Sequence, residues 1–210
     1  MNKPVSLKQL RRLPLYLKFL YELKAEGTER VASPAMAKYF SCSEEQIRKD
    51  LQIVSEGEGK PGSGRIVCDL INSIEEYLGY NDTTTCIIVG VGHLGKAFLS
   101  YDGFQNHGLK ILAGFDTNKA VIGSEINGKK IFDIQKLENL VSRLNIHIAI
   151  ITTPNDVAQE IATKLVDAGI QGIWNFTTKK LVVPDNVAVE YVNLSSSLAV
   201  LSHKIKKNNL

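Results

Sequence analysis

The stretch that decides the fold reads Thr85-Cys86-Ile87-Ile88-Val89-Gly90-Val91-Gly92-His93-Leu94-Gly95. A short apolar run leads directly into Gly-x-Gly-x-x-Gly, and a helical pattern follows the last glycine. A second apolar run, residues 109–115, ends at Asp116, which lies 21 residues after Gly95. This order of strand, glycine turn, helix, strand and acid is typical of a dinucleotide-binding unit.

Each glycine of the motif has an expected role. Gly90 permits the tight turn, Gly92 lets the backbone approach a pyrophosphate, and Gly95 lets the helix pack close to the strand. The pyrophosphate would lie over the N–H groups at the positive end of the helix, so we expect contacts from Gly90, Val91, Gly92, His93, Leu94 and Gly95. Asp116 would accept a ribose 2′-OH and repel a 2′-phosphate, which favours NAD(H) over NADP(H). The alternative is a glycine-rich turn that binds nothing.

The chain from Thr85 onward alternates strands and helices, which predicts an α/β unit with a parallel sheet. We expect strands at 85–89, 109–115, 129–132, 146–151, 171–175 and 187–192, and helices at 94–102, 134–143, 155–168 and 196–206. Ligands of such sheets bind at the carboxyl ends of the strands. Further candidate cofactor contacts are therefore Thr117, Thr153, Pro154, Asn175 and Phe176. Tyr101, near the end of the first helix, could close over the cofactor.

Composition limits the remaining classes. The chain is 44% apolar and 22% charged, as expected of a globular protein. We read no signal peptide and no apolar run of roughly 18 residues, so we expect no membrane span. The three cysteines have no metal-ligand spacing, so we expect no metal site and reduced thiols in the cytoplasm.

The N-terminal region combines a basic patch with helical patterns. Residues 1–20 contain five Lys or Arg and no acid, a local charge that suits phosphate groups although the net charge is only +3. Residues 7–26 are apolar at helical spacing; Pro14 can open the main helix and Gly27 can end it. The alternative is a solvated helix face.

Two more helices follow, separated by a tight turn. Ser33 is expected to cap a short helix that ends at Phe40, and Ser43 with Gln46 forms a capping box for the next helix. This arrangement predicts a helix-turn-helix in a winged-helix setting. A plain amphipathic surface helix is the alternative for the second of these helices.

The helix after Ser43 separates its faces. Ile47, Leu51 and Val54 would pack inward, and basic and amide side chains, which read base edges and bind phosphates, lie on the other side. The glycine-rich segment 55–65 stands where a wing would be, or is a linker. The candidate DNA contacts are Arg11, Arg12, Ser43, Gln46, Arg48, Lys49, Gln52, Lys60 and Arg65.

Several of these segments together resemble the Rex family of redox-sensing bacterial transcriptional repressors, over about residues 11–201. The most specific are Arg11-Arg12-Leu13-Pro14 and Arg48-Lys49-Asp50-Leu51; the glycine turn, Tyr101-Asp102-Gly103-Phe104, Phe115-Asp116 and the segment 168–176 also match. The resemblance implies a homodimer with an exchanged C-terminal helix. It also implies binding to a double-stranded, inverted-repeat operator with NAD⁺ or no ligand, and release by NADH.

The chain departs from the usual family pattern at named positions. The wing is one residue longer, lacks both aromatic residues, and has Pro61 where an arginine is usual. Lys18 and Asn193 stand where family members often have an Arg–Asp pair, and His93 replaces a commoner asparagine. Thr177-Thr178 follows Asn175-Phe176 in place of Ala-Pro.

The predicted organisation is a winged-helix domain over 1–80, a Rossmann NAD(H)-binding domain over 81–194 and a dimerisation helix over 195–210. We expect a cytoplasmic NADH-responsive repressor and no enzyme. The 130 residues after Tyr80 leave no room for a substrate domain, and we find no pair of residues suited to proton transfer. The alternatives are an NAD- or CoA-binding Rossmann enzyme, and a DNA-binding module whose cofactor is structural and senses nothing.

Overall fold

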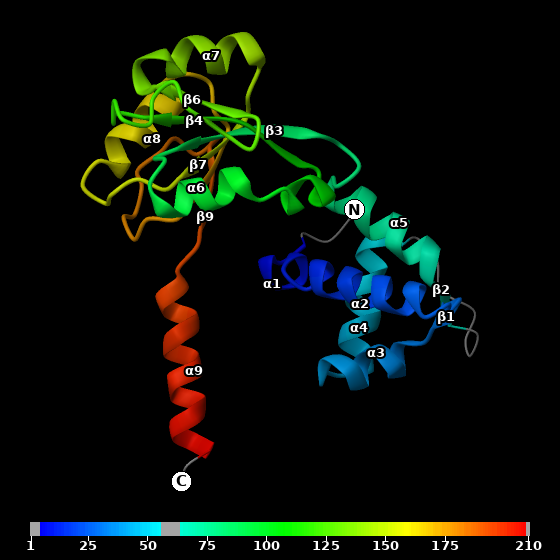
Figure 1. Cartoon of the computed structure of the whole chain (residues 1–210). Coiled ribbons are helices and arrows are strands. Elements are labelled where there is room, and N and C mark those ends of the chain that lie inside the picture. Colours follow the sequence, from blue (N-terminus) through cyan, green and yellow to red (C-terminus); the bar gives the residue numbers. More distant parts are fainter. Residues whose placement is uncertain (1–4, 56–63, 209–210) are drawn as a thin grey trace. The chain divides into compact units, whose positions relative to one another are not determined.

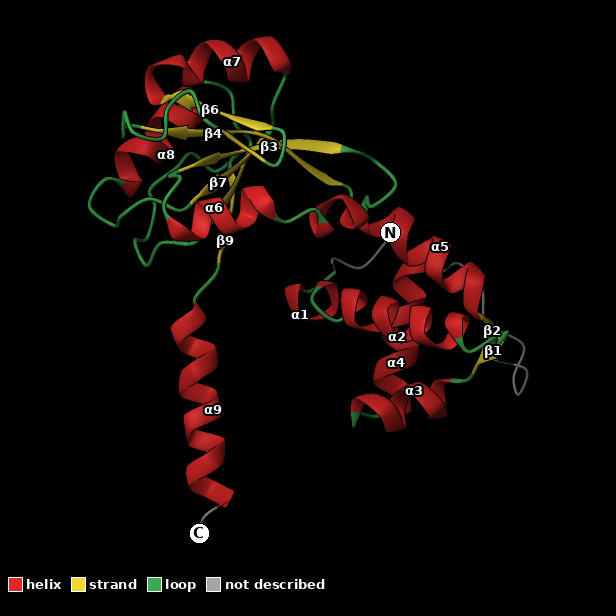
Figure 2. Ribbon diagram, viewed as in Figure 1, coloured by secondary structure: helices red, strands yellow, loops and turns green. Residues whose placement is uncertain are grey.

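The computed structural model describes residues 5–55 and 64–208, which fall into two compact units (Figure 1). Unit 1 runs from Met1 to Asp82 and is mainly helical, whereas unit 2, Thr83–Leu210, contains a sheet between helices (Figure 2). Lys60 and most of the predicted wing lie outside the described residues. A search of the described helices finds none with the length and apolar character that a membrane span requires.

Unit 1 has the order of elements expected of a helix-turn-helix beside a small two-stranded sheet. Its described elements are α1 (Leu7–Leu10), α2 (Leu13–Ala25), β1 (Arg30–Val31), α3 (Ser33–Phe40), α4 (Glu44–Val54), β2 (Arg65–Ile66) and α5 (Val67–Leu78). Strands β1 and β2 pair antiparallel. Pro14 lies in the first turn of α2, and Gly27 follows the helix end at φ +77°, both as predicted. The hydrophobic core is built from α2, α3, α4 and α5.

The helix caps of unit 1 differ in part from the prediction. The predicted capping box of α4 is only half formed: the Ser43 side chain accepts a hydrogen bond from the backbone N–H of Gln46 at 3.2 Å, but among the described residues no bond runs from the Gln46 side chain back to Ser43. The prediction for Ser33 is wrong: α3 already includes Ser33, and Ala32 is its N-cap with no side-chain hydrogen bond. A complete capping box, which the sequence analysis missed, instead joins Ser6 and Gln9 at α1.

Unit 2 is a parallel sheet with one antiparallel edge strand, in the order β5-β6-β4-β3-β7-β8-β9. Its strands are β3 (Thr84–Val89), β4 (Leu109–Asp116), β5 (Glu125–Ile126), β6 (Lys129–Asp133), β7 (Ile148–Ile151), β8 (Gly172–Asn175) and β9 (Ala188–Tyr191). The chain moves outward from β3 to β4 and β6, then crosses back to β7 on the other side of β3. The carboxyl ends of β3 and β7 therefore meet at the position where open α/β sheets bind ligands.

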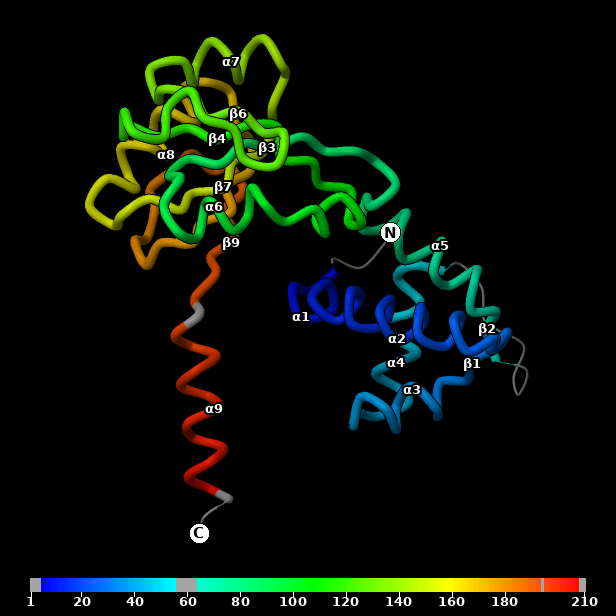
Figure 3. Tube along the Cα trace, in the orientation of Figure 1, coloured from blue at the N-terminus to red at the C-terminus, as the bar shows by residue number. Residues whose placement is uncertain are grey.

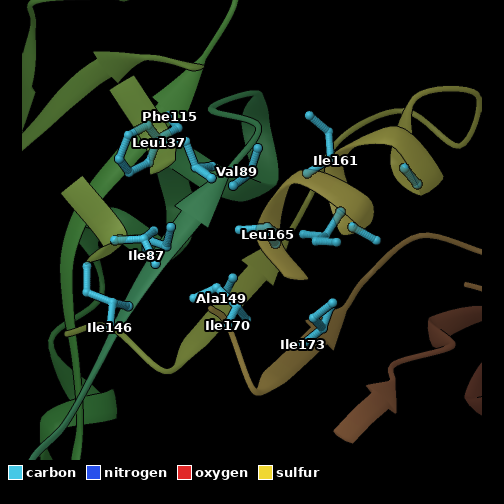
Figure 4. Packing of buried hydrophobic residues seen from close by; sticks show 14 of the residues in the cluster. Ile87, Val89, Phe115, Leu137, Ile146, Ala149, Ile161, Leu165, Ile170 and Ile173 are labelled. Atoms are coloured by element: carbon cyan, nitrogen blue, oxygen red, sulfur yellow. The ribbon is translucent and has the colours of Figure 1, made fainter. Parts of the chain in front are cut away.

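Helices cover both faces of this sheet. The helices of unit 2 are α6 (His93–Ser100), α7 (Leu137–Leu144), α8 (Ala158–Asp167) and α9 (Leu194–Asn208), with 3₁₀ turns η1 (Gly103–His107) and η2 (Ile134–Lys136). Ile87 and Val89 of β3 pack with α7 and α8, and Leu165 of α8 lies in this core (Figure 4). Cys86 and Ile88, which alternate with them, point to the α6 face.

The boundaries of several elements differ from the predicted ones. Strand β7 begins at Ile148, two residues later than predicted, and the carbonyl of His147 just before it accepts hydrogen bonds from the N–H groups of residues 171 and 172. Helix α8 begins three residues later than expected, after a turn in which the Asn155 side chain bonds Thr178. Strand β5 and the turn η1 were not predicted. The last helix begins at Leu194 rather than residue 196, and Asn193 accepts a hydrogen bond from the N–H of Ser196.

Candidate functional site

The glycine turn connects β3 to α6 in a conformation that requires glycine (Figure 3). Gly90 has φ +96°, and a Cβ there would come within 2.8 Å of the backbone between Thr152 and Thr153. A Cβ on Gly95 would overlap the carbonyl oxygen of Gly90. Gly92, in contrast, faces open space, since no atom of the described chain lies within 4 Å of its added Cβ. The geometry is therefore the one predicted: Gly90 permits the tight turn, Gly95 permits close packing of the helix on the strand, and Gly92 leaves the approach to the turn open.

Thr152 fastens this turn to the neighbouring strand. Its hydroxyl donates to the carbonyl oxygen of Gly90 at 2.6 Å, and its backbone N–H donates to that of Val89 at 2.9 Å. The sequence analysis did not single out Thr152. Its position after an apolar strand, beside two predicted contacts, was the available signal. The glycine turn is therefore held by the carboxyl end of β7 as well as by its own conformation.

The carboxylate of Asp116 lies at the end of β4, beside the turn. One oxygen accepts the backbone N–H of Val91 at 2.6 Å, and the other accepts that of Asn118 at 2.8 Å. The side chain is only partly buried, and each carboxylate oxygen has a further lone pair. Asp116 is thus oriented by the backbone and still has capacity to accept ribose hydroxyls.

A pocket of about 170 Å³ opens at the carboxyl ends of β3, β4 and β7. Five predicted contacts line it, namely Gly90, Asp116, Thr117, Thr153 and Pro154. Residues of the α8 side that the sequence analysis missed line it too, namely Val157, Glu160, Ile161 and Lys164. The Thr153 hydroxyl is buried and has no hydrogen-bond partner within the described chain. A mostly apolar pocket with an unsatisfied polar atom fits a flat heteroaromatic ring such as adenine.

Three of the predicted cofactor contacts lie elsewhere. Tyr101 is 56% exposed and follows α6, and Phe176 belongs to an aromatic cluster with Phe98, Phe104 and Trp174 on the α6 face. The side chain of Asn175 is fully buried; its amide donates to the Lys179 carbonyl and accepts the Thr177 N–H. Asn175 therefore shapes the turn after β8 and does not present its side chain to a ligand in this structure.

These features fit a dinucleotide. The N-terminus of α6 is capped by Gly92, without a side-chain hydrogen bond from the described residues, so its first N–H groups are available to a pyrophosphate. The turn, the acid and the pocket supply positions for phosphates, ribose and adenine respectively. Bound NAD(H) would bring a nicotinamide ring whose charge depends on its oxidation state.

Helix α4 presents the predicted nucleic-acid face. Ile47 and Leu51 are buried, whereas Arg48, Lys49 and Gln52 are exposed. The two cations make i,i+4 ion pairs, Arg48 with Glu44 at 3.5 Å and Lys49 with Glu45 at 2.7 Å. Exposed pairs of this kind contribute only about 0–1 kcal/mol each. Both cations can therefore exchange a carboxylate for a phosphate at small cost.

The position of Arg12 requires a correction. Its guanidinium donates two hydrogen bonds to the Asp50 carboxylate, at 2.6 and 2.8 Å, and the Tyr16 hydroxyl donates to the same carboxylate at 2.8 Å. Burial first, and then the bond to Asp50, raises the pKa of Tyr16, and Asp50 raises that of Arg12. The structure therefore assigns Arg12 to holding α4 against α2 rather than to the exposed DNA-binding set. Asp50 and Tyr16 were missed by the sequence analysis.

The other predicted DNA contacts have different surroundings. Ser43 and the partly buried Gln46 form the N-terminal turn of α4, and Arg11 is exposed at the end of α1. Arg65 lies in β2, where its side chain contacts the Ser55 hydroxyl and burial lowers its pKa. Lys18 is exposed on α2, and Asn193 caps α9.

Comparison with known protein families matches both parts of the chain. The family described as "CoA binding domain" matches residues 81–179, and the family described as "Putative DNA-binding protein N-terminus" matches residues 5–52. The first match covers the glycine turn and the pocket, and the second covers the helix-turn-helix.

Individual relatives match along nearly the whole chain. The redox-sensing transcriptional repressor Rex of Treponema denticola is 42% identical over 192 residues, which cover 91% of each chain. The Rex repressor of Clostridium botulinum strain Hall is 39% identical, with 98% of each chain covered. Both relatives are described as repressors, not as enzymes.

Solved structures agree with these relatives. The Rex-family repressor RSP in complex with β-NAD⁺ and operator DNA has a TM-score of 0.92 at 36% identity, covering 99% of this chain and 95% of that one. RSP in complex with β-NADH has a TM-score of 0.89 at 35% identity, with coverages of 99% and 97%.

Proposed function

This chain belongs to the Rex family of redox-sensing transcriptional repressors, and on that premise we propose that it binds operator DNA and releases it when NADH binds. The observation that carries the proposal is the similarity over 99% of the chain to RSP, a repressor solved with β-NAD⁺ and operator DNA. The glycine turn and the exposed face of α4 give this chain a candidate site for each ligand.

Cofactor binding is assigned to three groups of residues. The glycine turn would bind the pyrophosphate, and Asp116 with the pocket beside it would bind the adenosine. Tyr101, Phe176 and the neighbouring aromatic cluster would border the nicotinamide end. Asn175 supports this region through its buried amide and is not proposed as a direct contact.

The preference for the reduced cofactor follows from charge. The nicotinamide ring of NADH is neutral, whereas that of NAD⁺ is cationic, and desolvating a charge is costly. A site that closes aromatic side chains over the ring therefore favours NADH. A ligand shifts an equilibrium only by its difference in affinity for the two states. A tenfold preference of NADH for the DNA-incompetent state would supply about 1.4 kcal/mol.

DNA binding is assigned to unit 1, with α4 as the recognition helix. Arg48, Lys49 and Gln52 would contact base edges and phosphates, and Ser43, Gln46, Arg11, Arg65 and Lys60 of the wing would contact the backbone. Arg12 is left out of this set because it holds Asp50.

The repressor is proposed to act as a cytoplasmic homodimer and to have no catalytic activity. Helix α9 exposes Leu198, Val200, Leu201 and Ile205, each by more than half, and a second copy would bury this apolar face. Two-fold symmetry would match an inverted-repeat operator, since each half-site would receive one α4.

The proposal is tested by binding measurements on the full chain. We expect tight binding of an inverted-repeat operator duplex at fixed salt, and binding of NADH but of neither NADPH nor CoA. The ribose of CoA carries a 3′-phosphate, which Asp116 would repel as it would a 2′-phosphate. Tight CoA binding without operator binding would support the alternative of a CoA-binding domain and contradict the proposal.

A further inference from the structure

Two side chains of the β5–β6 hairpin, Asn127 in its turn and Lys129 at the start of β6, hold the C-terminal end of α6. The Lys129 ammonium donates to the backbone carbonyl of Leu99 at 2.7 Å and to the Asp102 carboxylate at 3.3 Å. The amide of Asn127 donates to the Ser100 carbonyl at 3.3 Å and to the same Asp102 oxygen at 2.8 Å. Three acceptors between residues 99 and 102 are thus bound by one hairpin.

This arrangement is electrostatically favourable. The last carbonyls of a helix lack intrahelical partners and carry partial negative charge, which a cation stabilises. Lys129 is only 8% exposed, so its charge is little screened by water. Lys129 is thus a buried cation that belongs neither to the proposed cofactor contacts nor to the proposed DNA contacts. The bonds from Asn127 and Lys129 also lower the pKa of Asp102, which keeps the carboxylate charged.

The hairpin that carries these side chains has a tight turn. Asn127 and Gly128 form a two-residue connection between β5 and β6, with φ +48° and +74°. Positive φ at both central residues is the type I′ pattern, in which the backbone twist matches that of the paired strands. The position of the Asn127 amide is therefore fixed by a tight hairpin rather than by a long loop.

Tyr101 lies in the middle of the segment that is held. Its ring packs edge-on against Phe104, at 5.0 Å between centroids. A Cβ at Gly103 would overlap the Tyr101 ring, so the ring lies directly on the backbone of that glycine. Ser100 and Asp102, on either side of Tyr101, are both bound by Asn127. The direction in which the ring leaves the backbone thus depends on the β5–β6 turn.

We propose that Lys129 and Asn127 are positioning residues for Tyr101, and that through it they set how strongly the site prefers NADH over NAD⁺. The inference rests on the proposed function, in which Tyr101 borders the nicotinamide. Neither residue lines the adenosine pocket, and their hydrogen bonds within the described chain go to residues 99, 100 and 102 rather than to the glycine turn, so we expect them to affect the difference between the two cofactors more than the binding common to both.

The physical reason is the cost of closing a mobile ring. With the segment held, Tyr101 starts from one backbone conformation, and little entropy is lost when it closes over a neutral ring. Without Lys129 the C-terminal turn of α6 and Asp102 lose their cation, and the segment samples more conformations. Closure becomes less complete, water reaches the nicotinamide, and the penalty on the cationic ring decreases.

The decisive variant is Lys129→Met, which keeps an unbranched side chain of similar length and removes the charge. Lys130→Met is the matched control, because Lys130 is the next residue in β6, is exposed, and contacts the Phe132 ring instead. The dissociation constants of NADH and NAD⁺ are measured separately by calorimetry on the full chain. We expect the NAD⁺/NADH ratio of these constants to fall at least fivefold in Lys129→Met and to stay within twofold of the parent in Lys130→Met.

A second variant keeps the test decisive if Lys129→Met folds poorly. Asn127→Gly is compatible with the positive φ and removes only the amide that binds Ser100 and Asp102. We expect the ratio to fall about threefold, with NAD⁺ affinity within twofold of the parent and an unchanged melting temperature. Equal losses of NADH and NAD⁺ affinity in the two variants, or an unchanged ratio, would overturn the inference.

Failure of the proposed function would look different. In that case the parent chain would bind NADH and NAD⁺ equally well, or its operator affinity would stay the same when either cofactor is added. A parent that discriminates between the cofactors, together with variants that discriminate as well as the parent does, would contradict only the roles of Lys129 and Asn127.

Discussion

The glycine turn of unit 2 and helix α4 of unit 1, the proposed recognition helix, are built on different principles. The turn is made of backbone: Gly90 and Gly95 leave no room for a Cβ, and the groups proposed to bind the pyrophosphate are backbone N–H donors. Helix α4 is an ordinary amphipathic helix that displays exposed, replaceable side chains. The comparison suggests that substitutions in the turn abolish a function outright, whereas those on the helix adjust affinity by degrees.

The largest effect is expected from Gly92→Val. No atom of the described chain lies within 4 Å of a Cβ added at Gly92, and Gly92 has φ −73°, which other residues adopt readily. The valine would occupy the approach of the pyrophosphate, so we expect NADH affinity to fall at least about 100-fold. Calorimetry measures the loss, and thermal unfolding should show a melting temperature close to that of the parent.

Gly95→Ala is the contrasting variant within the same motif. Its Cβ would overlap the Gly90 carbonyl, so we expect a lower melting temperature as well as weaker NADH binding. If Gly92→Val bound NADH like the parent, the site assignment would be wrong. If Gly95→Ala were fully stable, the close packing of α6 on β3 would be in error.

The next prediction, within unit 1, compares the loss of a partly buried cation, Arg12, with the loss of an exposed one, Lys49. Arg12→Met leaves the buried Asp50 carboxylate without its ionic partner, and we expect the free energy of unfolding of unit 1 to fall by about 3 kcal/mol. Lys49→Met should change it by no more than about 0.5 kcal/mol, because the Lys49–Glu45 pair is exposed. Urea unfolding of both variants measures the difference; equal stabilities would contradict the role given to Arg12.

The turn was predictable from sequence, whereas the ion pair was not. Only glycine tolerates the positions of Gly90 and Gly95, so the motif and its spacing are visible in the sequence. Arg12 and Asp50 are separated by 38 residues, and nothing local to Arg12 distinguishes a cation that binds a carboxylate from one that binds phosphate. Asp50 stands within the motif Arg-Lys-Asp-Leu at a buried helical position, and that was the available signal.

The strands of the sheet likewise divide into those that the sequence predicts and one, β5, that it does not. Runs of apolar residues predict β3, β4, β6, β7, β8 and β9; the pattern is most continuous in β3 and β7, which are buried on both faces, whereas β9 is largely exposed. Strand β5 has only two residues, Glu125 and Ile126, and no such pattern. The pair Asn127-Gly128, which the sequence analysis passed over, is the hairpin signal that reveals it. Its contacts to the α6 end are tertiary, so no local pattern predicts them.

A moderate effect is expected on operator affinity from Lys49→Met. Loss of one phosphate or base contact should weaken binding about tenfold and reduce the salt slope by about one. The affinity for NADH should stay within twofold, since Lys49 lies in the other unit. Fluorescence anisotropy at several salt concentrations measures both quantities. An operator affinity equal to that of the parent would remove this face of α4 from the groove.

The smallest effect is expected from Asp116→Asn. The amide oxygen can still accept the Val91 N–H, which keeps the bond to the glycine turn, but the amide NH2 cannot accept the Asn118 N–H, and the negative charge is lost. We expect NADH affinity to fall only about threefold and NADPH affinity to rise, because the repulsion of a 2′-phosphate disappears. Parallel titrations of NADH and NADPH measure the change in preference. An unchanged ratio of the two affinities would contradict the ribose-binding role of Asp116.

The central claim is that the two units are coupled through the redox state of the cofactor, and one titration tests it most directly. The full chain is bound to a labelled inverted-repeat operator at one fixed salt concentration, because phosphate contacts make the affinity salt-dependent. NADH and NAD⁺ are then added in separate series. We predict release by NADH at concentrations where NAD⁺ leaves the complex intact. Operator binding that ignores both cofactors would contradict the claim and favour a DNA-binding module whose cofactor is only structural.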